Sequence, residues 1–600
     1  MSRVEDSPFT CECPEAMRRA CKAEGYFGEH DGNPYCVLHF PSSDKKQAFD
    51  AAVERKLTAK DFNYQGVWFP TGGWFSGLDI PETADFTCAT FDGRGSFRKT
   101  VFKQFAHFDH ATFMGGADFD SAVFAGPAYF GHATFKAGAR FDYTTFSKEV
   151  SFTEASFEGI VGFRKAKFEE SVDFWRCTFV KLREVDWVQF DEAVFNGHAN
   201  FSPVTFGSKA WFRAARFAAV TFGGSRFSAE AVFQDASFAG VWFVGVEFQN
   251  QANFFSTTFK GQAYFSSASF QALTRFTLAT FGGDTLFLST VFSGATDFSN
   301  AVFKDYVTFS APYGRGGFTG HSNCDFQHAR FERPERVSFH TIALRPHWFL
   351  NVDPRKFEFV DVAWAGNSAR NFIDCEIGAL TKREEVRAEE RSKSKEERRR
   401  NAQMTGDEYT LKEMEEDEVE EAQLDLNDPS KVELSLYRLL SITCRQLAVN
   451  AEENHRYDEA SDFRFWSMEL RRKEGWRARA RLSVSILHSL YRHLSGYGEE
   501  IGRALGILIG LWLIFALLYT QVGFVRTESP AAGMYISDEV GTPLKGSKEA
   551  FAYSLATITL QRPEPRPLTA AAKFAVLAET IFGPIQAALF ALAVRRRFMR

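Results

Sequence analysis

The residues best suited to chemistry are cysteines and a histidine near the N-terminus. Four of the nine cysteines of this 600-residue chain lie within the first 36 residues. Cys13, Cys21, Cys36 and His39 have the spacing C-x7-C-x14-C-x2-H, and Cys11 is an alternative first ligand. Three thiolates and one imidazole form a donor set that Zn²⁺ accepts in tetrahedral structural sites. The spacing therefore predicts a structural zinc site, and the alternative is a small helical lid packed by free thiols.

A second group of polar residues lies near the C-terminus, in sequence that is otherwise apolar. Thr557 and Thr559 stand near the end of the apolar stretch Ala550–Leu560, and Arg562 and Arg566 follow it. Eleven apolar residues are too few to cross a bilayer, but they are too hydrophobic for an exposed loop. The resemblance to pore-loop channels described below implies that these four polar residues line a pore.

Glu579 lies inside a longer apolar segment, Ala570–Val594, and Gly583 and Pro584 come shortly after it. A carboxylate within a membrane span is costly and usually faces the interior of a helix bundle or water. A Gly-Pro pair can bend a helix, as a gating hinge requires. Two interpretations remain open. Glu579 lines a pore that bends at Gly583 and Pro584, or it pairs with an Arg or Lys in a plain two-helix anchor.

The elements that must hold these residues include two membrane spans. Ala504–Val525 has 22 residues without a charge, and Ala570–Val594 is the second span. An amphipathic stretch, Leu482–Tyr497, precedes the first span. The basic residues before this stretch and after the second span are Arg471, Arg472, Lys473, Arg477, Arg479, Arg481, Arg595, Arg596, Arg597 and Arg600.

These basic flanks predict the topology, because positively charged residues stay on the cytoplasmic side of a membrane. We expect a multi-pass protein of the cytoplasmic (inner) membrane, with membrane lipid around it and both termini in the cytosol. Residues 526–569 would then lie outside. The polar N-terminus and the scattered cysteines are consistent with a reducing cytosol around the rest of the chain.

Phenylalanine dominates the first half of the chain at a regular spacing. The chain has 67 Phe but only 16 Tyr and 11 Trp. From Phe86 to Phe309 the spacing is five or six residues, in alternation over most of this range, apart from a disturbance between Val185 and Gln189. A period of 11 residues with no alternation of polarity predicts a solenoid rather than an amphipathic helix or a simple strand. Two units would make one four-sided coil of about 22 residues.

The runs of the form AxFxxAxF, such as Ala111–Phe119, resemble the pentapeptide-repeat family in a Phe-centred subclass, over roughly residues 62–340. The resemblance implies a mainly β fold, a right-handed quadrilateral β-helix. Some members of that family mimic DNA and bind topoisomerases, which requires an acidic surface. Between Ala84 and Ser310 the chain has 22 acidic and 20 basic residues. We therefore expect no mimicry and no nucleic-acid partner, but a rod that docks an unknown cytosolic protein.

The predicted organisation has six parts. They are a Cys/His cap at 1–60, the solenoid at 61–345, its end cap at 346–380, a charged linker at 381–430, a helical hairpin at 431–482, and the membrane part at 483–600.

The membrane part resembles the two-transmembrane pore-loop channels, with Ala550–Leu560 in the place of the pore helix. Gly496–Ala504 and Glu579–Phe598 also prompt comparison with bacterial membrane proteins that join a pentapeptide solenoid to such a domain. The resemblance implies a homo-oligomer, with four subunits in a channel. Because prolines and the arginines Arg562 and Arg566 stand where the filter glycines would be, potassium selectivity is not expected.

No pattern in the chain indicates an enzyme, because it has no phosphate-binding glycine loop, nucleophile elbow or paired metal-ligand histidine motif. Two hypotheses follow. The chain is an oligomeric channel-like membrane protein whose cytosolic solenoid serves docking, sensing or assembly, or it is a non-conducting scaffold anchored in the membrane.

Overall fold

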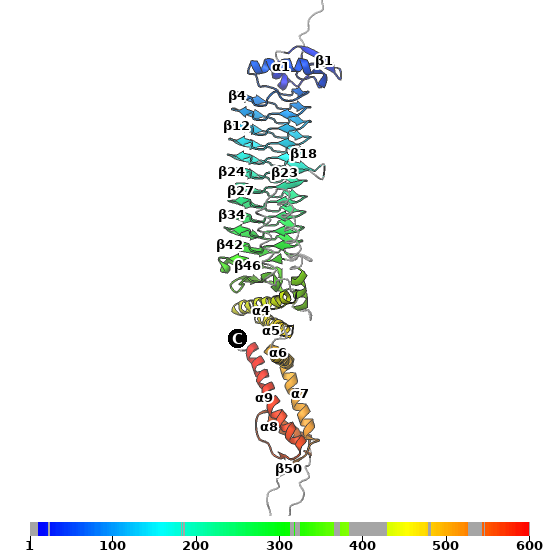
Figure 1. The fold of residues 1–600 in the computed structure, drawn as a ribbon, viewed down its shortest axis with the longest axis vertical. Coiled ribbons are helices and arrows are strands. Elements are labelled where there is room, and N and C mark those ends of the chain that lie inside the picture. Colours follow the sequence, from blue (N-terminus) through cyan, green and yellow to red (C-terminus); the bar gives the residue numbers. More distant parts are fainter. Residues whose placement is uncertain are drawn as a thin grey trace, which may run out of the picture. The chain divides into compact units, whose positions relative to one another are not determined.

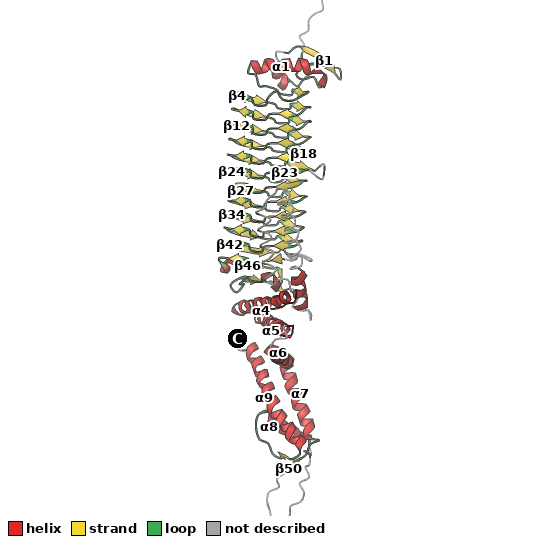
Figure 2. Cartoon of the chain, in the orientation of Figure 1, coloured by secondary structure: helices red, strands yellow, loops and turns green. Residues whose placement is uncertain are grey.

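The computed structural model describes residues 10–21, 24–181, 183, 186–311, 317–318, 324–364, 373–382, 429–477, 482–525, 543–544 and 546–598. The chain divides into two compact units, Met1–Ala365 and Gly366–Arg600. The first unit consists mainly of strands and the second of helices (Figure 2). Most of the predicted charged linker lies outside the described residues.

The first unit is a β-solenoid (Figure 1). Each of its coils has four sides. In one coil, β10 (Thr112–Phe113), β11 (Ala117–Asp118), β12 (Val123–Phe124) and β13 (Ala128–Tyr129) form the sides in turn. The next strand, β14 (Thr134–Phe135), pairs with β10 in parallel, with Phe135 opposite Phe113. The two residues are 22 positions apart. The predicted β-solenoid and the length of its coil are therefore confirmed.

The strands of successive coils stack into long parallel sheets. One sheet of 11 strands begins with β3 (Trp68–Phe69) and ends with β40 (Val291–Phe292). A second, also of 11 strands, runs from β7 (Gly95–Ser96) to β44 (Cys324–Asp325). The other two sides join into one sheet of 23 strands. They join because β24 (Val194–Asn200) and β27 (Arg216–Thr221) each run through a corner.

Each side of a coil places one phenylalanine and one small residue in the interior. Phe119 and Phe141, on the same side of consecutive coils, are fully buried, and their rings stack with centroids 4.8 Å apart. The small residue on that side of the first coil is the buried Ala117. Stacked aromatic pairs contribute about 0.5–1.5 kcal/mol each beyond the burial of their area. Phenylalanine suits this interior because its ring has no polar group that would need a partner there.

Every second corner of a coil contains a residue with a positive φ angle. His110 (φ 58°) is one example, and the same conformation recurs 11 positions later at Ser121 and at His132. The corner is a tight turn, because the amide of Ala111 donates to the carbonyl of Phe108 at 3.1 Å. The strain of left-handed backbone at non-glycine residues is opposed by hydrogen bonds between coils, such as that from the His110 amide to the Gly131 carbonyl (2.8 Å).

The predicted disturbance near residue 185 is an insertion into one coil. Val161 of β19 (Val161–Gly162) pairs with Val188 of β23 (Trp187–Gln189), 27 positions later instead of 22. The ladder continues beyond the five additional residues without a change of side. The insertion therefore lengthens one coil and leaves the stack of rings intact, because Phe163 stacks on Phe190 at 4.8 Å.

The solenoid also continues past the predicted boundary at residue 345. β46 (Val337–His340) pairs with β48 (Glu358–Val360), and β47 (Ala343–Leu344) pairs with β49 (Ala363–Trp364). Part of the segment expected to be an end cap, 346–380, thus belongs to the coils. The buried Trp348 helps to fill the last of them.

The N-terminal segment covers the first coil. It contains the hairpin of β1 (Tyr26–His30) and β2 (Asn33–Cys36) and the helix α1 (Lys46–Thr58). Phe49 of α1 contacts the ring of Phe69 in β3 at 5.4 Å. This contact protects the aromatic column where the next coil is missing, as the end of a solenoid requires.

The second unit contains a helical segment at 373–382 and then the helical hairpin that was predicted from the sequence. α4 (Pro429–Glu453) and α5 (Tyr457–Arg477) pack together through buried apolar residues, and Ser441 and Ser467 are hydrogen-bonded across them. The amphipathic helix α6 (Leu482–Ser495) follows.

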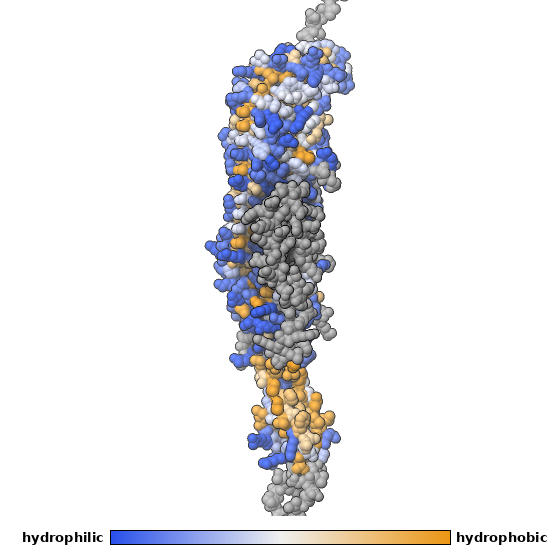
Figure 3. Space-filling model, viewed as in Figure 1, coloured by the Kyte–Doolittle hydropathy of each residue, from blue (hydrophilic) through white to orange (hydrophobic). Residues whose placement is uncertain are grey.

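A short turn, η5 (Gly496–Gly498), leads from α6 into α7 (Ile501–Tyr519). The last elements are β50 (Phe524–Val525), α8 (Ser547–Ile558), β51 (Arg566–Pro567) and α9 (Ala570–Phe598). Within the described residues, α7 and α9 are long and apolar enough to cross a membrane. Hydrophobic residues dominate the visible surface of this part of the chain (Figure 3).

The stack of rings predicts a large difference between buried and exposed phenylalanines. We expect Phe130→Ala, at a fully buried position, to lower the free energy of opening of its coil by about 3–5 kcal/mol, because it leaves a cavity in the column. Phe105→Ala, at a side chain that is 43% exposed, should cost under about 1 kcal/mol. Hydrogen exchange of the full-length protein measures both. Equal losses would contradict the stacked-core interpretation.

Candidate functional site

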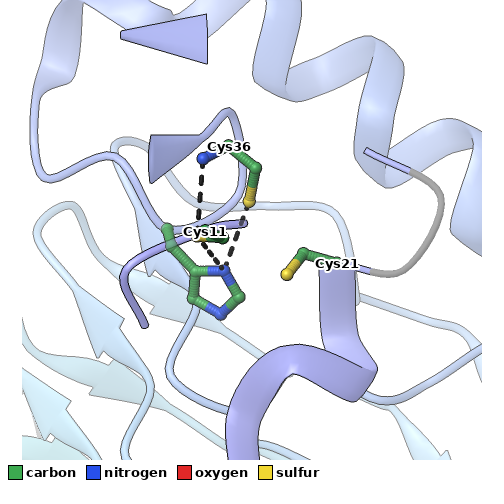
Figure 4. A group of neighbouring side chains, drawn as sticks. Cys11, Cys21 and Cys36 are labelled. Atoms are coloured by element: carbon green, nitrogen blue, oxygen red, sulfur yellow. Dashed lines mark hydrogen bonds between the residues drawn. The ribbon is translucent and has the colours of Figure 1, made fainter. Parts of the chain in front are cut away.

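Four potential metal ligands come together in the N-terminal segment. Cys11, Cys21, Cys36 and His39 are buried, and their ligand atoms lie within 4.8 Å of one another. Figure 4 shows the three cysteine side chains gathered around one point. The grouping depends on the hairpin of β1 and β2, because the amide of Cys36 donates to the sulfur of Cys11 at 3.5 Å. Residues far apart in the sequence thus supply the four donors of a tetrahedral site.

The orientation of His39 suits a metal ligand. Its Nε2 donates to the backbone carbonyl of Gln65 at 2.9 Å, so Nδ1 is the free nitrogen. Nδ1 lies 3.3 Å from the sulfur of Cys36 and 3.7 Å from that of Cys11. A carbonyl that fixes the second ring nitrogen is the usual support of a metal-binding histidine.

The members of the group hold their protons unequally. Burial lowers the pKa of His39, but contacts with the Cys11 and Cys36 thiols outweigh it and raise the pKa to about 9. The thiols of Cys21 and Cys36 lower the pKa of Cys11, whereas contact with Cys11 raises the pKa of Cys21 to about 12. The group thus retains protons that a bound metal ion would displace.

The structure decides between the two candidates for the first ligand. The alternative Cys11 is a member of this group, whereas Cys13, which the spacing favoured, is buried beside it and its thiol contacts those of Cys11 and Cys21. Spacing alone leaves both choices open, because the sulfur that faces Cys36 depends on how the preceding segment lies on β2, where the amide of Glu12 donates to the carbonyl of Pro34 at 2.9 Å.

Lys45 was not singled out in the sequence, yet it is buried beside this segment. Its Nζ donates to the carbonyl of Leu38 at 2.8 Å and lies 4.5 Å from the centre of the Phe49 ring. Burial lowers the pKa of Lys45 to about 6, and the thiols of Cys36 and Cys11 act in the opposite direction. Lysine is commonly a surface residue. The sequence therefore contained no sign that Lys45 is buried beside the ligand group.

A second polar site joins the three helices near the C-terminus. Glu579 of α9 is fully buried. Its carboxylate accepts hydrogen bonds from the hydroxyl of Tyr519 in α7 and from that of Ser554 in α8. Ser554 also contacts the backbone carbonyl of Trp512 at 3.2 Å. The sequence analysis identified Glu579 but neither hydroxyl partner, because Tyr519 and Ser554 have no distinctive spacing relative to it.

Gly583 lies where α8 and α9 approach each other closely. A Cβ atom at this position would lie 2.8 Å from Cγ1 and 3.3 Å from Cα of Ile558. The helix α9 continues through Pro584. Gly583 thus permits the close packing of two helices, which is a different role from the hinge considered in the sequence.

The remaining residues of the predicted pore group are distributed along a hairpin. Thr557 is buried and its hydroxyl donates to the carbonyl of Tyr553 at 2.9 Å, whereas Thr559 is exposed. Arg562 and Arg566 are also exposed, and Arg566 stands opposite Val525 in the pairing of β51 with β50. The chain therefore leaves the end of α7, runs through α8 along the helices α7 and α9, and comes back to the end of α7 at β51.

Comparisons with known proteins agree with the solenoid. A family model described as pentapeptide repeats in nine copies matches residues 108–156 and 141–181. The coils in this part of the chain are pentapeptide repeats. The matched residues include the coil of β10 to β13, whose sides each hold one phenylalanine. No curated protein and no solved structure matched the chain.

The ligand group predicts which thiols control metal content. We expect purified full-length protein to carry one metal ion per chain, and Cys11→Ser to lose it, because a hydroxyl is a poor replacement for a thiolate ligand. Cys13→Ser is the matched control and should retain the metal. Inductively coupled plasma mass spectrometry measures the stoichiometry. Loss in the Cys13 variant with retention in the Cys11 variant would contradict the assignment.

Proposed function

We propose that the chain is an oligomeric, channel-like protein of the cytoplasmic membrane that carries a cytosolic pentapeptide solenoid. One observation supports this proposal above the others. A non-helical segment with exposed charges begins at Leu560, directly after the end of α8 that packs against the middle of α9, at a depth where a spanning helix would be surrounded by lipid. From there it returns to Arg566, which lies opposite Val525.

The depth follows from the contacts of α8. At its beginning, the amide of Leu544 donates to the carbonyl of Tyr519 at the end of α7. At the end of α8, Ile558 packs against Gly583. Gly583 is thirteen residues after Ala570, or about 20 Å along the helix at roughly 1.5 Å per residue. The tip of this hairpin therefore reaches the middle part of α9.

Lipid cannot surround such a segment. Gln561, Arg562 and Glu564 are exposed in the single chain, and Leu560 is 63% exposed. Irregular backbone and charged side chains at membrane depth are tolerated only where protein covers them or where they line water. Further copies of the chain around a closed symmetry axis would provide both the cover and the water-filled path. Four copies is the number that the resemblance to pore-loop channels implies.

In this assembly the candidate residues have two kinds of role. Thr559, Arg562 and Arg566 lie on the exposed side of the hairpin and would face the path, where the two arginines would disfavour cations. Glu579 and Gly583 would act as positioning residues, because they hold α8 against its neighbours.

The topology of the proposal is the one expected from the basic residues. Arg595 and Arg596 lie in the last turn of α9, and cytoplasmic flanks carry such charges. The solenoid would then dock or sense a cytosolic protein. We also propose Zn²⁺ as the ion of the N-terminal site, because three thiolates and an imidazole are a common ligand set for structural zinc. The zinc would fix the cap on the first coil.

The alternative, a non-conducting scaffold, is favoured by the conformation of the segment that follows α8. Arg566 is held by the pairing of β51 with β50, and three prolines interrupt the segment after Leu560. Such a segment does not offer the row of carbonyl groups by which a potassium filter replaces the water of an ion.

Planar-bilayer recording of the purified, reconstituted protein distinguishes the two functions. We expect unitary currents, and we expect Arg562→Glu to shift the reversal potential in a salt gradient toward cation permeation, because it inverts a charge on the path. Arg438→Glu, an exposed position on α4, is the matched control and should leave selectivity unchanged. Silent bilayers with intact oligomers would support the scaffold, and a monomer in native mass spectrometry would refute both the assembly and the path.

Glu579→Gln tests the positioning role. Glutamine has one acceptor oxygen where the carboxylate has two, so it cannot accept both hydroxyl hydrogen bonds in the same way. We expect a lower thermal stability in detergent and fewer active channels, with unchanged current per open channel. A changed unitary conductance in a normally stable variant would instead place Glu579 on the ion path.

A further inference from the structure

A cavity rich in arginine lies within the helical unit, away from the hairpin of α8. It has a volume of about 450 Å³ and is bounded by residues of α4, α5, α6, η5 and α9. Its arginines are Arg445, Arg464, Arg471 and Arg596, which come from three different helices. The volume falls in the range of small-molecule sites.

The charge of this arginine cavity is strongly positive. Glu499 is the one carboxylate among its lining residues. This carboxylate already has partners, because it lies 3.2 Å from Nη1 of Arg596 and accepts from the hydroxyl of Ser461 at 2.8 Å. The other three arginines of the lining therefore face the cavity without a lining carboxylate to neutralise them.

Arg464 gives the second indication of a ligand. It forms an ion pair with Glu452 through Nη2, but its Nη1 is buried and has no hydrogen-bond partner among the described residues. A buried donor without an acceptor costs free energy. Unlike Arg464, Arg445 and Arg471 have no ion pair within the part of the chain that the structure describes. Guanidinium groups bind phosphate oxygens through paired hydrogen bonds, so several together suit a phosphate ester.

The surroundings of the cavity place it at a membrane surface if α7 and α9 span the bilayer. Arg596 lies near the end of α9, and α7 begins shortly after η5. Helix α6, which contributes Tyr491 to the lining, exposes Ile486, Leu487 and Leu490. An exposed apolar face beside basic residues is typical of helices that lie among lipid headgroups.

We propose that the arginine cavity binds the phosphate headgroup of an anionic phospholipid from the cytoplasmic leaflet. The inference rests on the membrane placement in the proposed function, but it does not depend on conduction. The bound phosphate would bridge arginines of α4, α5 and α9. It would thereby attach the α4–α5 hairpin to the end of a spanning helix.

Binding to full-length protein in neutral detergent tests the proposal. Microscale thermophoresis would use dioctanoyl phosphatidylglycerol, dioctanoyl phosphatidylcholine and inorganic phosphate as ligands. We expect saturable binding of the phosphatidylglycerol, and binding at least about ten-fold weaker for the other two, since the first lacks net charge and the second lacks acyl chains. Arg445→Gln and Arg464→Gln should each weaken phosphatidylglycerol binding about five-fold, as expected for one charge near a lipid surface.

Arg438→Gln is the matched control, because it removes the same charge from an exposed position of α4 that does not line the cavity. It should bind like the unchanged protein. Arg445 is itself exposed, so its substitution tests the site even if Arg464→Gln fails to fold. Equal effects of all three substitutions, or equal binding of both lipids, would overturn the proposal.

The binding data and the bilayer recordings together test two questions separately: where the bound phosphate comes from, and whether the protein conducts ions. Inorganic phosphate that binds as tightly as phosphatidylglycerol would overturn the lipid assignment in favour of a free phosphate ester. Selective binding of phosphatidylglycerol in a protein that gives silent bilayers would support the lipid site and refute conduction alone.

Discussion

The aromatic column in the interior of the solenoid is the interaction on which the first unit depends. A four-sided coil of two-residue strands has few backbone hydrogen bonds within itself, and it gains stability only from the coils above and below it. Rings such as Phe119 and Phe141 stack along one side, and tight corners keep the coil narrow enough for them to touch. This geometry tolerates an insertion such as that before Trp187, because Phe163 still stacks on Phe190 across it.

A stacked column has two ends, and each needs a cover because an open coil exposes rings and unpaired backbone groups. At the N-terminal end Phe49 provides that cover, and the ligand group of Cys11, Cys21, Cys36 and His39 holds the segment around it together. A segment of this size has a small apolar core of its own, and a metal ion compensates for that deficit in many small domains. The potential metal ligands of the first unit thus lie in the N-terminal segment that covers the first coil.

The second unit places polar groups where they must be satisfied by neighbours. Glu579 is shared by three helices, and its hydroxyl partners allow a carboxylate to be buried among apolar side chains. The arginines around the cavity between α5 and α9 are in a different situation, because Arg464 retains an unpartnered nitrogen. The first site is complete within one chain and therefore stabilises it. The second is incomplete, and for that reason it suggests a ligand.

The sequence by itself determined the coil, the two long apolar helices and the residue types of the sites. Periodicity and hydropathy are local properties, so the repeat of 11 residues and the apolar lengths of α7 and α9 could be predicted directly. Only the tertiary structure decided that Cys11 rather than Cys13 joins the ligand group, that Tyr519 and Ser554 bind Glu579, and that Gly583 packs against Ile558. Each of these contacts depends on a hairpin register or on the rotation of one helix against another. Such relations are set by packing between distant segments, and no pattern along the chain records them.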